Sequence, residues 1–201
     1  MSLLESGFRE AGRSSLSSRP AIAKHRTLEQ LLIVNGHPDP RPERFCAALG
    51  QACLAGAEAG GRDANVIALG AIFPTNGQDG SGELTKALNL WRQPARLMVI
   101  FPLWLDKPPE IVTRFFNHMT HESGPALTNR RAHILVTMSL PAFAHRSMLR
   151  EHEGVRHVQQ AMALPGLEID ALNFVGSVDT ISRAQREEWL YRLGRLGGGK
   201  S

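Results

Sequence analysis

The sequence predicts an α/β domain with a five-stranded parallel sheet and helices on both faces, on the strength of two observations. Short runs of continuous apolar residues, such as 31–35 and 97–101, alternate with amphipathic segments of helical length. Such runs are typical of strands that are covered on both faces, as in parallel sheets. Gly36 and Pro102 interrupt the pattern at the ends of these two runs. A chain that alternates strand and helix in this way favours right-handed crossovers and a doubly wound sheet.

The first half of the chain supplies two strands and two helices. Residues 31–35 form the first predicted strand, and residues 43–59 carry Ala, Leu and Cys at helical spacing before Gly60-Gly61 ends the helix. Residues 65–69 are the second apolar run. Residues 71–82 are predicted to be a loop because they contain Pro74, Asn76, Gly77, Gly80 and Gly82. A short helix over 83–91 follows.

The second half repeats the alternation. Residues 97–101 are the third strand, and Pro108-Pro109 open a helix that continues to 121, since proline is tolerated in a first turn. Residues 133–137 are the fourth strand, followed by a helix over 154–164. Residues 172–178 are the fifth strand. A closing helix over 182–196 has Ser182 as its expected N-cap.

Length and composition indicate one domain. The 201 residues and 22.0 kDa are enough for a substantial core, and 42% hydrophobic with 21% charged residues is ordinary for a globular protein. We assign 1–27 to an N-terminal extension, 28–197 to the domain and 198–201 to a tail. The extension is rich in Ser and Arg and has no apolar core, so it does not read as a secretory signal.

The same composition argues against several function classes. No apolar run approaches the roughly 20 residues that span a bilayer, so we expect no membrane insertion. The net charge of +4 is diluted by acidic neighbours and forms no basic stripe with aromatics, so nucleic-acid binding is not expected. Cys46 and Cys53 are seven apart on one predicted helix, too far for a disulfide, which fits buried thiols in the cytoplasm. His118 and His121 have no evident third ligand, so no metal site is predicted.

Three loops follow predicted strands, and the carboxyl ends of parallel strands are where ligands bind in this class. Residues 36–45 leave the first strand and enter a helix, where His37, Arg41 and Arg44 could meet a phosphate. The alternative is a Pro-rigid turn with solvated arginines. Residues 101–109 offer an exposed Leu103-Trp104 pair that suits a planar aromatic ligand, or else Trp104 caps the core edge.

The third loop, residues 137–146, offers hydroxyl groups and one imidazole. Thr137 and Ser139 could form hydrogen bonds to a ligand, and His145 could donate to a substrate carbonyl. The alternative for His145 is a structural or solvated histidine.

The order of the motifs in these loops resembles the flavodoxin-like NAD(P)H:quinone oxidoreductases, in their bacterial branch. G-H-P-D-P at 36–40 comes first, F-P-L-W at 101–104 with P-P at 108–109 follows, and V-T-M at 136–138 precedes P-A at 141–142. F-V-G at 174–176 and E-E-W-L at 187–190 are also similar. The resemblance covers roughly residues 31 to 196.

The resemblance implies a fold and a chemistry. The fold is a flavodoxin-like three-layer sandwich with strand order 2-1-3-4-5. The family binds FMN or FAD non-covalently, takes hydride from NAD(P)H by a ping-pong route and passes two electrons to a quinone, so this chain is expected to be such an enzyme. Its members are usually homodimers, which we expect here by resemblance only.

The resemblance also implies roles for individual residues. On the phosphate side of the flavin it places His37, Arg41, Arg44 and Phe45. Against the ring it places Pro102, Leu103, Trp104 and Leu105, and at the polar edge of the ring Thr137, Met138 and Ser139. His145 stands where relatives carry a Tyr near the substrate, and it is the predicted catalytic residue.

Several positions depart from the family pattern. Arg41 stands where relatives usually have a hydroxyl residue, Cys46 where they often have Asn, and Asp106 and Ser139 where they usually have Gly. Two alternative functions therefore remain open besides that of an enzyme. One is an ancillary subunit of a potassium-efflux system, as close relatives of the family are, and the other is a flavodoxin-like interaction protein that binds no flavin.

Overall fold

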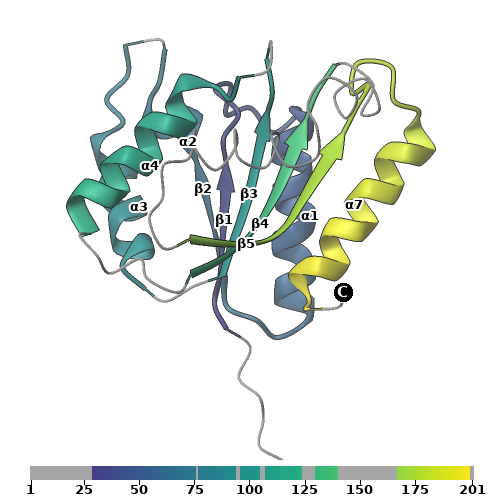
Figure 1. The fold of residues 1–201 in the computed structure, drawn as a ribbon, viewed down its shortest axis with the longest axis horizontal. Helices are drawn as coiled ribbons and strands as arrows, with labels where there is room; N and C mark the ends of the chain where they lie inside the picture. The colour runs from purple at the N-terminus through teal and green to yellow at the C-terminus, as the bar shows by residue number, and fades with distance from the viewer. Residues whose placement is uncertain are drawn as a thin grey trace, which may run out of the picture.

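A five-stranded parallel sheet in the order β2-β1-β3-β4-β5 forms the centre of the molecule (Figure 1). The computed structural model describes residues 29–75, 77–93, 96–104, 107–123, 130–139 and 167–199. The strands are β1 (Leu31–Asn35), β2 (Ala64–Ala68), β3 (Arg96–Pro102), β4 (Arg130–Thr137) and β5 (Leu167–Val175). The predicted strand order is confirmed.

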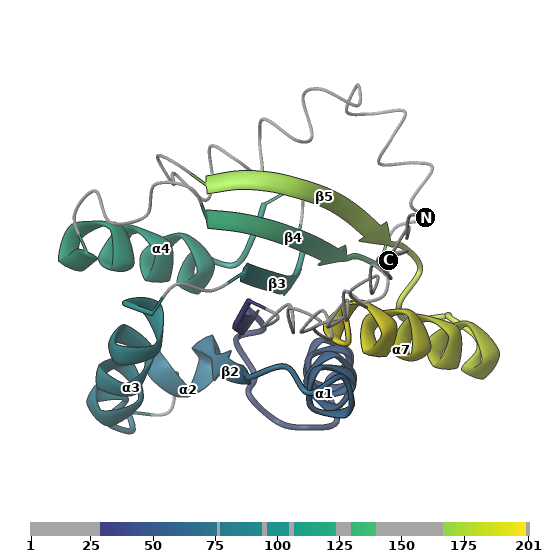
Figure 2. The same cartoon turned by 90° about the horizontal axis from the view of Figure 1, so that it is seen from below.

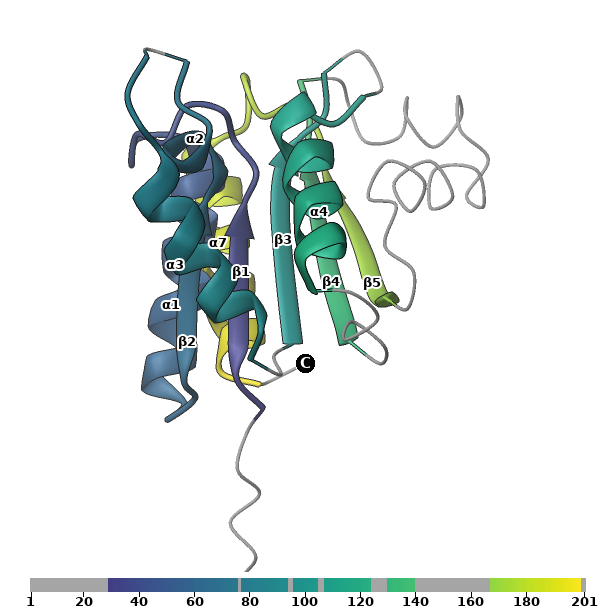
Figure 3. The ribbon, with the colours of Figure 1, turned by 90° about the vertical axis from the view of Figure 1, so that its left-hand side faces the viewer.

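Helices cover both faces of this sheet, which confirms the predicted three layers. On one face lie α1 (Phe45–Ala59) and α7 (Arg183–Gly197), and on the other lie α2 (Leu69–Ile72), α3 (Ser81–Trp91) and α4 (Glu110–Ser123) (Figure 2). The view in Figure 3 looks onto α3 and α4, with the strands behind them and α1 and α7 beyond the sheet. The interior strand β1 is buried along its whole length, as its continuous apolar run predicts.

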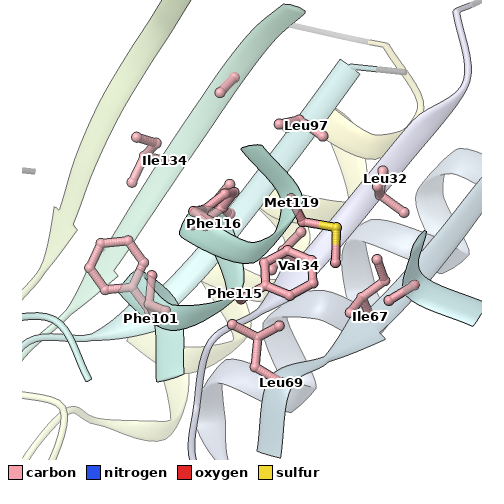
Figure 4. Close-up of a cluster of buried hydrophobic side chains, with 14 of the residues drawn as sticks. Leu32, Val34, Ile67, Leu69, Leu97, Phe101, Phe115, Phe116, Met119 and Ile134 are labelled. Carbon is pink, nitrogen blue, oxygen red and sulfur yellow. The ribbon is translucent and has the colours of Figure 1, made fainter. Parts of the chain in front are cut away.

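The larger core cluster lies between α4 and the sheet. Val112, Phe115, Phe116 and Met119 recur at helical spacing and are fully buried, so α4 presents one apolar stripe to the strands. Figure 4 shows three of them over side chains of β1, β2, β3 and β4. Phe115 and Phe116 meet edge to face, with ring centroids 5.4 Å apart.

The second core cluster lies under α1 and α7, which contact each other through a seam of small residues. A Cβ added at Gly56 would lie 1.8 Å from the carbonyl oxygen of Gly194, and one at Gly197 would lie 1.9 Å from that of Cys53. Only glycine allows the two backbones to approach so closely. The N-terminus of α7 is closed by a capping box between Ser182 and Gln185, which confirms Ser182 as the N-cap.

Several predicted boundaries were wrong. The fifth strand begins at Leu167, not at 172, because its first half alternates half-buried and exposed residues instead of forming an apolar run. Glu168 and Asp170 are on this half, and both pair with Arg131 of β4. The strand also ends at Val175, before 178, since the chain turns at Ser177, whose φ is 56°.

The predicted loop over 71–82 also needs correction. Leu69 does not end β2 but begins α2, and α3 already begins at Ser81. The carboxylate of Asp79 accepts hydrogen bonds from the backbone N–H and the hydroxyl of Ser81, at 2.9 and 2.8 Å, which stabilises the start of α3. The fourth strand begins three residues earlier than predicted, at Arg130. The helix predicted over 154–164 lies outside the described residues.

The two cysteines lie buried on α1 as free thiols, as predicted. Burial raises the pKa of Cys53 to about 12, so this thiol stays protonated. Of the helices that the structure describes, none combines the length and apolar character needed to cross a membrane.

Candidate functional site

The carboxyl ends of β1, β3 and β4 lie side by side at one edge of the sheet, which is the upper edge in Figure 1. Strand order reverses at β1, since β2 and β3 pair with its two sides. The backbone N–H of Gly36 donates to the carbonyl of Ile100 at 2.7 Å, and that of Leu103 donates to Thr137 at 2.7 Å. The three predicted loops therefore leave the sheet next to one another, at the position where doubly wound proteins bind ligands.

A cavity of about 480 Å³ lies at this edge. All three loops contribute to it, together with the turn after β5 and the first part of α7. Its lining consists of His37, Pro38, Asp39, Glu43, Arg44, Phe45, Cys46, Pro102, Trp104, Thr137, Ser139, Val178, Asp179 and Arg186.

The first loop is held close to the sheet by its own hydrogen bonds. The buried side chain of Asn35, the last residue of β1, accepts a bond from the backbone N–H of His37 at 3.1 Å. The backbone N–H of Asp39 donates to Nδ1 of His37 at 3.0 Å. A Cβ at Gly36 would lie 2.8 Å from Cβ of Phe101, so glycine is needed where the loop passes β3.

The charged residues of this loop form one cluster. The carboxylate of Asp39 accepts from the guanidinium of Arg41 at 2.6 to 3.0 Å and from Nε of Arg44 at 2.7 Å. The hydrogen bond from Arg41 is the main reason why the pKa of Asp39 lies far below its ordinary value. Burial lowers the pKa of His37, so this imidazole is neutral near pH 7.

The second loop places one aromatic side chain at the cavity and one aliphatic side chain in the core. Trp104 is 51% exposed and lines the cavity, with its ring 6.1 Å from that of His37 and nearly perpendicular to it. Backbone hydrogen bonds with Lys107 in both directions, at 2.9 and 3.0 Å, hold Trp104 in place. Leu103 is buried in the core beside α4, so the predicted exposed Leu-Trp pair was wrong for Leu103.

The third loop likewise places one side chain at the cavity and one in the core. Ser139 is exposed at the cavity, whereas Met138 is buried in the core, so its side chain does not reach the cavity. The hydroxyl of Thr137 lies 3.3 Å from Sγ of Cys46. Burial raises the pKa of Cys46 to about 11, so the thiol is neutral and serves as a hydrogen-bonding neighbour of Thr137.

Sequence reasoning missed the contribution of α7. The guanidinium of Arg186 lies 4.7 Å above the ring of Phe45 and donates to the carbonyl of Val178 at 3.3 Å. It adds a third arginine to the surroundings of the first loop. The available signal was positional: a parallel fifth strand ends at the same edge, so the turn after it and the first turns of the next helix belong there too.

The remaining predicted residues lie beside the cavity or outside the described residues. Arg41 lines an adjoining groove of about 1010 Å³ between the first loop and the α2–α3 region. Pro38 and Asp39 line both spaces, so the groove continues from the cavity past the arginine cluster. Leu105 and His145 are outside the part of the chain that the structure describes.

Comparison with known proteins identifies the fold. An NAD(P)H:quinone oxidoreductase from Methanothermobacter marburgensis matches with a TM-score of 0.63 at 14% identity, over 85% of this chain and 96% of that one. The general stress protein 14 of Treponema denticola, in complex with FMN, matches with 0.58 at 16% identity, over 85% and 95%. An NADPH-quinone reductase from P. pentosaceus matches with 0.59 at 15% identity, over 84% and 97%.

This chain has the flavodoxin-like fold. At these identities, the likeness to flavodoxin-like proteins concerns the architecture and leaves the activity to be argued from the site. No protein-family model matches the sequence. No curated protein matches it either.

Proposed function

We propose that this flavodoxin-like protein is a flavin-dependent oxidoreductase that transfers two electrons from NAD(P)H to a quinone or a similar electron-poor aromatic acceptor. The observation that carries the proposal is the cavity, which is lined by Arg44 of the first loop, Arg186 of α7 and the exposed Trp104 of the second loop. Cationic side chains and an exposed aromatic ring match the two ends of a phosphate-bearing planar heterocycle. The solved structures of like fold include quinone reductases and an FMN complex.

Each part of the cavity would do a separate task. Arg44, helped by Arg41, would hold the flavin phosphate at the start of α1, where free backbone N–H groups also favour an anion. Trp104 and Pro102 would lie against the ring, and the hydroxyls of Thr137 and Ser139 would bind its polar edge. A bound flavin would supply the two-electron hydride chemistry, while the chain orients the reactants and excludes water.

His145 is proposed as the residue that donates to the carbonyl of the acceptor. A neutral or cationic imidazole can donate a hydrogen bond or a proton to such an oxygen near pH 7. We also propose that the protein acts as a homodimer in the cytoplasm, and light scattering on the purified chain checks its oligomeric state.

The test begins with visible absorbance of the purified protein, before and after incubation with excess FMN or FAD and desalting. A retained flavin spectrum, followed by NADH or NADPH oxidation that depends on a soluble quinone, is the expected result. FAD carries an adenosine that FMN lacks, so comparing the two flavins also tests whether the groove beyond Asp39 binds a nucleoside.

A second function, an interaction protein or ancillary subunit without flavin, is favoured by one observation. Both arginines of the first loop are already paired with Asp39, so a cofactor phosphate has to compete for them. If the protein stays colourless after both incubations and recovers a membrane transporter in a pull-down, the proposed enzymatic function is rejected in favour of an ancillary subunit.

A further inference from the structure

The carboxylate of Asp39 occupies the groups that an anionic ligand would use. It accepts the backbone N–H of Arg41 at 3.1 Å and the Nε and Nη2 groups of its guanidinium at 2.9 and 2.6 Å. Nε and Nη2 of Arg44 approach the same carboxylate at 2.7 and 2.5 Å. The Nε–Nη2 edge of each guanidinium is the fork that binds carboxylates and phosphates alike. Asp39 therefore uses the N–H groups with which these two arginines would bind a phosphate group.

The backbone around Asp39 is restrained, so a rotation of side chains is enough to separate its carboxylate from the arginines. Prolines at positions 38 and 40 restrict φ on both sides. The N–H of Asp39 is held by His37, which in turn is held by Asn35 at the end of β1. Asp39 stays tethered beside the arginines after such a rotation, and a tethered group acts at a high effective concentration.

The pairing is nevertheless open to exchange. The side chains of Arg41 and Arg44 are 65% and 44% exposed, so water screens their attraction to Asp39. A ligand that carries two negative charges neutralises both cations, whereas a monoanion offers no more charge than the tethered carboxylate does.

We propose that Asp39 is a built-in competitor for the Arg41–Arg44 pair, so that the first loop selects dianionic phosphate esters and rejects carboxylates and other monoanions. The inference rests on the proposed function, because it names the residue that sets the affinity for the cofactor phosphate. It can also be tested independently of flavin binding, since inorganic phosphate and acetate bind the same arginines without a flavin ring.

The variant Asp39→Asn tests the inference in the full chain. It keeps the shape of the side chain and removes the competing charge. Titration with FMN should show binding about tenfold tighter than in the wild type, because a negative charge within a few ångströms of the phosphate has been removed. Binding of riboflavin, which has no phosphate, should not change. Acetate should compete with inorganic phosphate for Asp39→Asn but not for the wild type.

Glu43→Gln is the matched control. Glu43 lies in the same loop, lines the same cavity and influences Arg41 through its charge. Within the part of the chain that the structure describes, it makes no hydrogen bond to either guanidinium. The control should shift FMN affinity by no more than about twofold, since an exposed charge without contact is screened. An equal gain in both variants would mean that net charge alone decides, which overturns the inference.

Three further outcomes are decisive. Weaker FMN binding by Asp39→Asn would show that Asp39 positions the arginines for the ligand. Equal gains in affinity for FMN and riboflavin would show that the effect does not depend on the phosphate. Either result overturns the inference. If neither flavin binds any variant, the proposed function fails on its own. The inference is then decided by inorganic phosphate, which must bind Asp39→Asn more tightly than the wild type. Asp39→Ser provides the same comparison if the Asn variant is poorly folded.

Discussion

Replacing Gly56 by Ala in α1 tests the seam between α1 and α7. The added Cβ would lie 1.8 Å from the carbonyl oxygen of Gly194, where ordinary contact begins at 3.4 Å. The obstacle is backbone, so the helices must separate by well over an ångström. Overpacking costs about 1–3 kcal/mol, and a backbone clash belongs at the upper end. The higher helix propensity of alanine offsets about 1 kcal/mol of this cost. The free energy of unfolding should therefore fall by about 2 kcal/mol.

Gly50→Ala is the control on the same helix. Its Cβ would meet only Cγ2 of Ile33, at the ordinary distance of 3.7 Å. The favourable change in helix propensity then meets no clash, and the free energy of unfolding should rise by roughly 0.5–1 kcal/mol. Urea unfolding followed by far-UV circular dichroism measures both variants, with the midpoint shift interpreted only where the m-values agree. If Gly56→Ala proves as stable as Gly50→Ala, the two helices do not meet at this seam and the reasoning is refuted.

Three further predictions concern the site and its pH dependence. Trp104→Ala should weaken flavin retention, whereas Tyr191→Ala, which removes an even more exposed aromatic from α7, should leave the retained absorbance unchanged. His145→Ala should lower quinone turnover more than flavin binding, and equal losses would indicate a structural residue. Burial lowers the pKa of His133 below 6.5, so the native state binds fewer protons than the unfolded chain as the pH falls below that value. The urea midpoint should therefore fall as the pH is lowered through 6.5, and less steeply in His133→Gln.

The fold could be predicted from the sequence because buried parallel strands form recognisable apolar runs, and the same runs indicate the edge of the sheet at which the candidate site lies. The runs that became β1 and β3 are covered on both faces, and their ends define the edge at which the loops meet. The first half of β5 was missed because only one of its sides is sheltered, and its alternating Glu168 and Asp170 resemble a surface segment.

The burial of two residues in these loops could have been predicted by continuing the two-residue alternation of the strands one step further. Leu103 follows Phe101 by two residues and shares its side of the sheet, and Met138 follows Val136 in the same way. The pairing of Asp39 with the arginines and the position of Arg186 over Phe45 could not be derived from the sequence. Both depend on rotamers and on the packing of helices far apart along the chain, which local patterns do not encode.

The contact between α1 and α7 has a consequence for how the protein is made. Helix α1 follows the first strand of the sheet, whereas α7 follows all five. The apolar cluster beneath them joins Leu49 and Cys53 from α1 with Leu193 from α7. During synthesis, this cluster stays incomplete until α7 has left the ribosome, so the nascent chain exposes apolar surface for most of its translation. Emergence of α7 is then the step that allows the apolar side of α1 to be buried in this cluster.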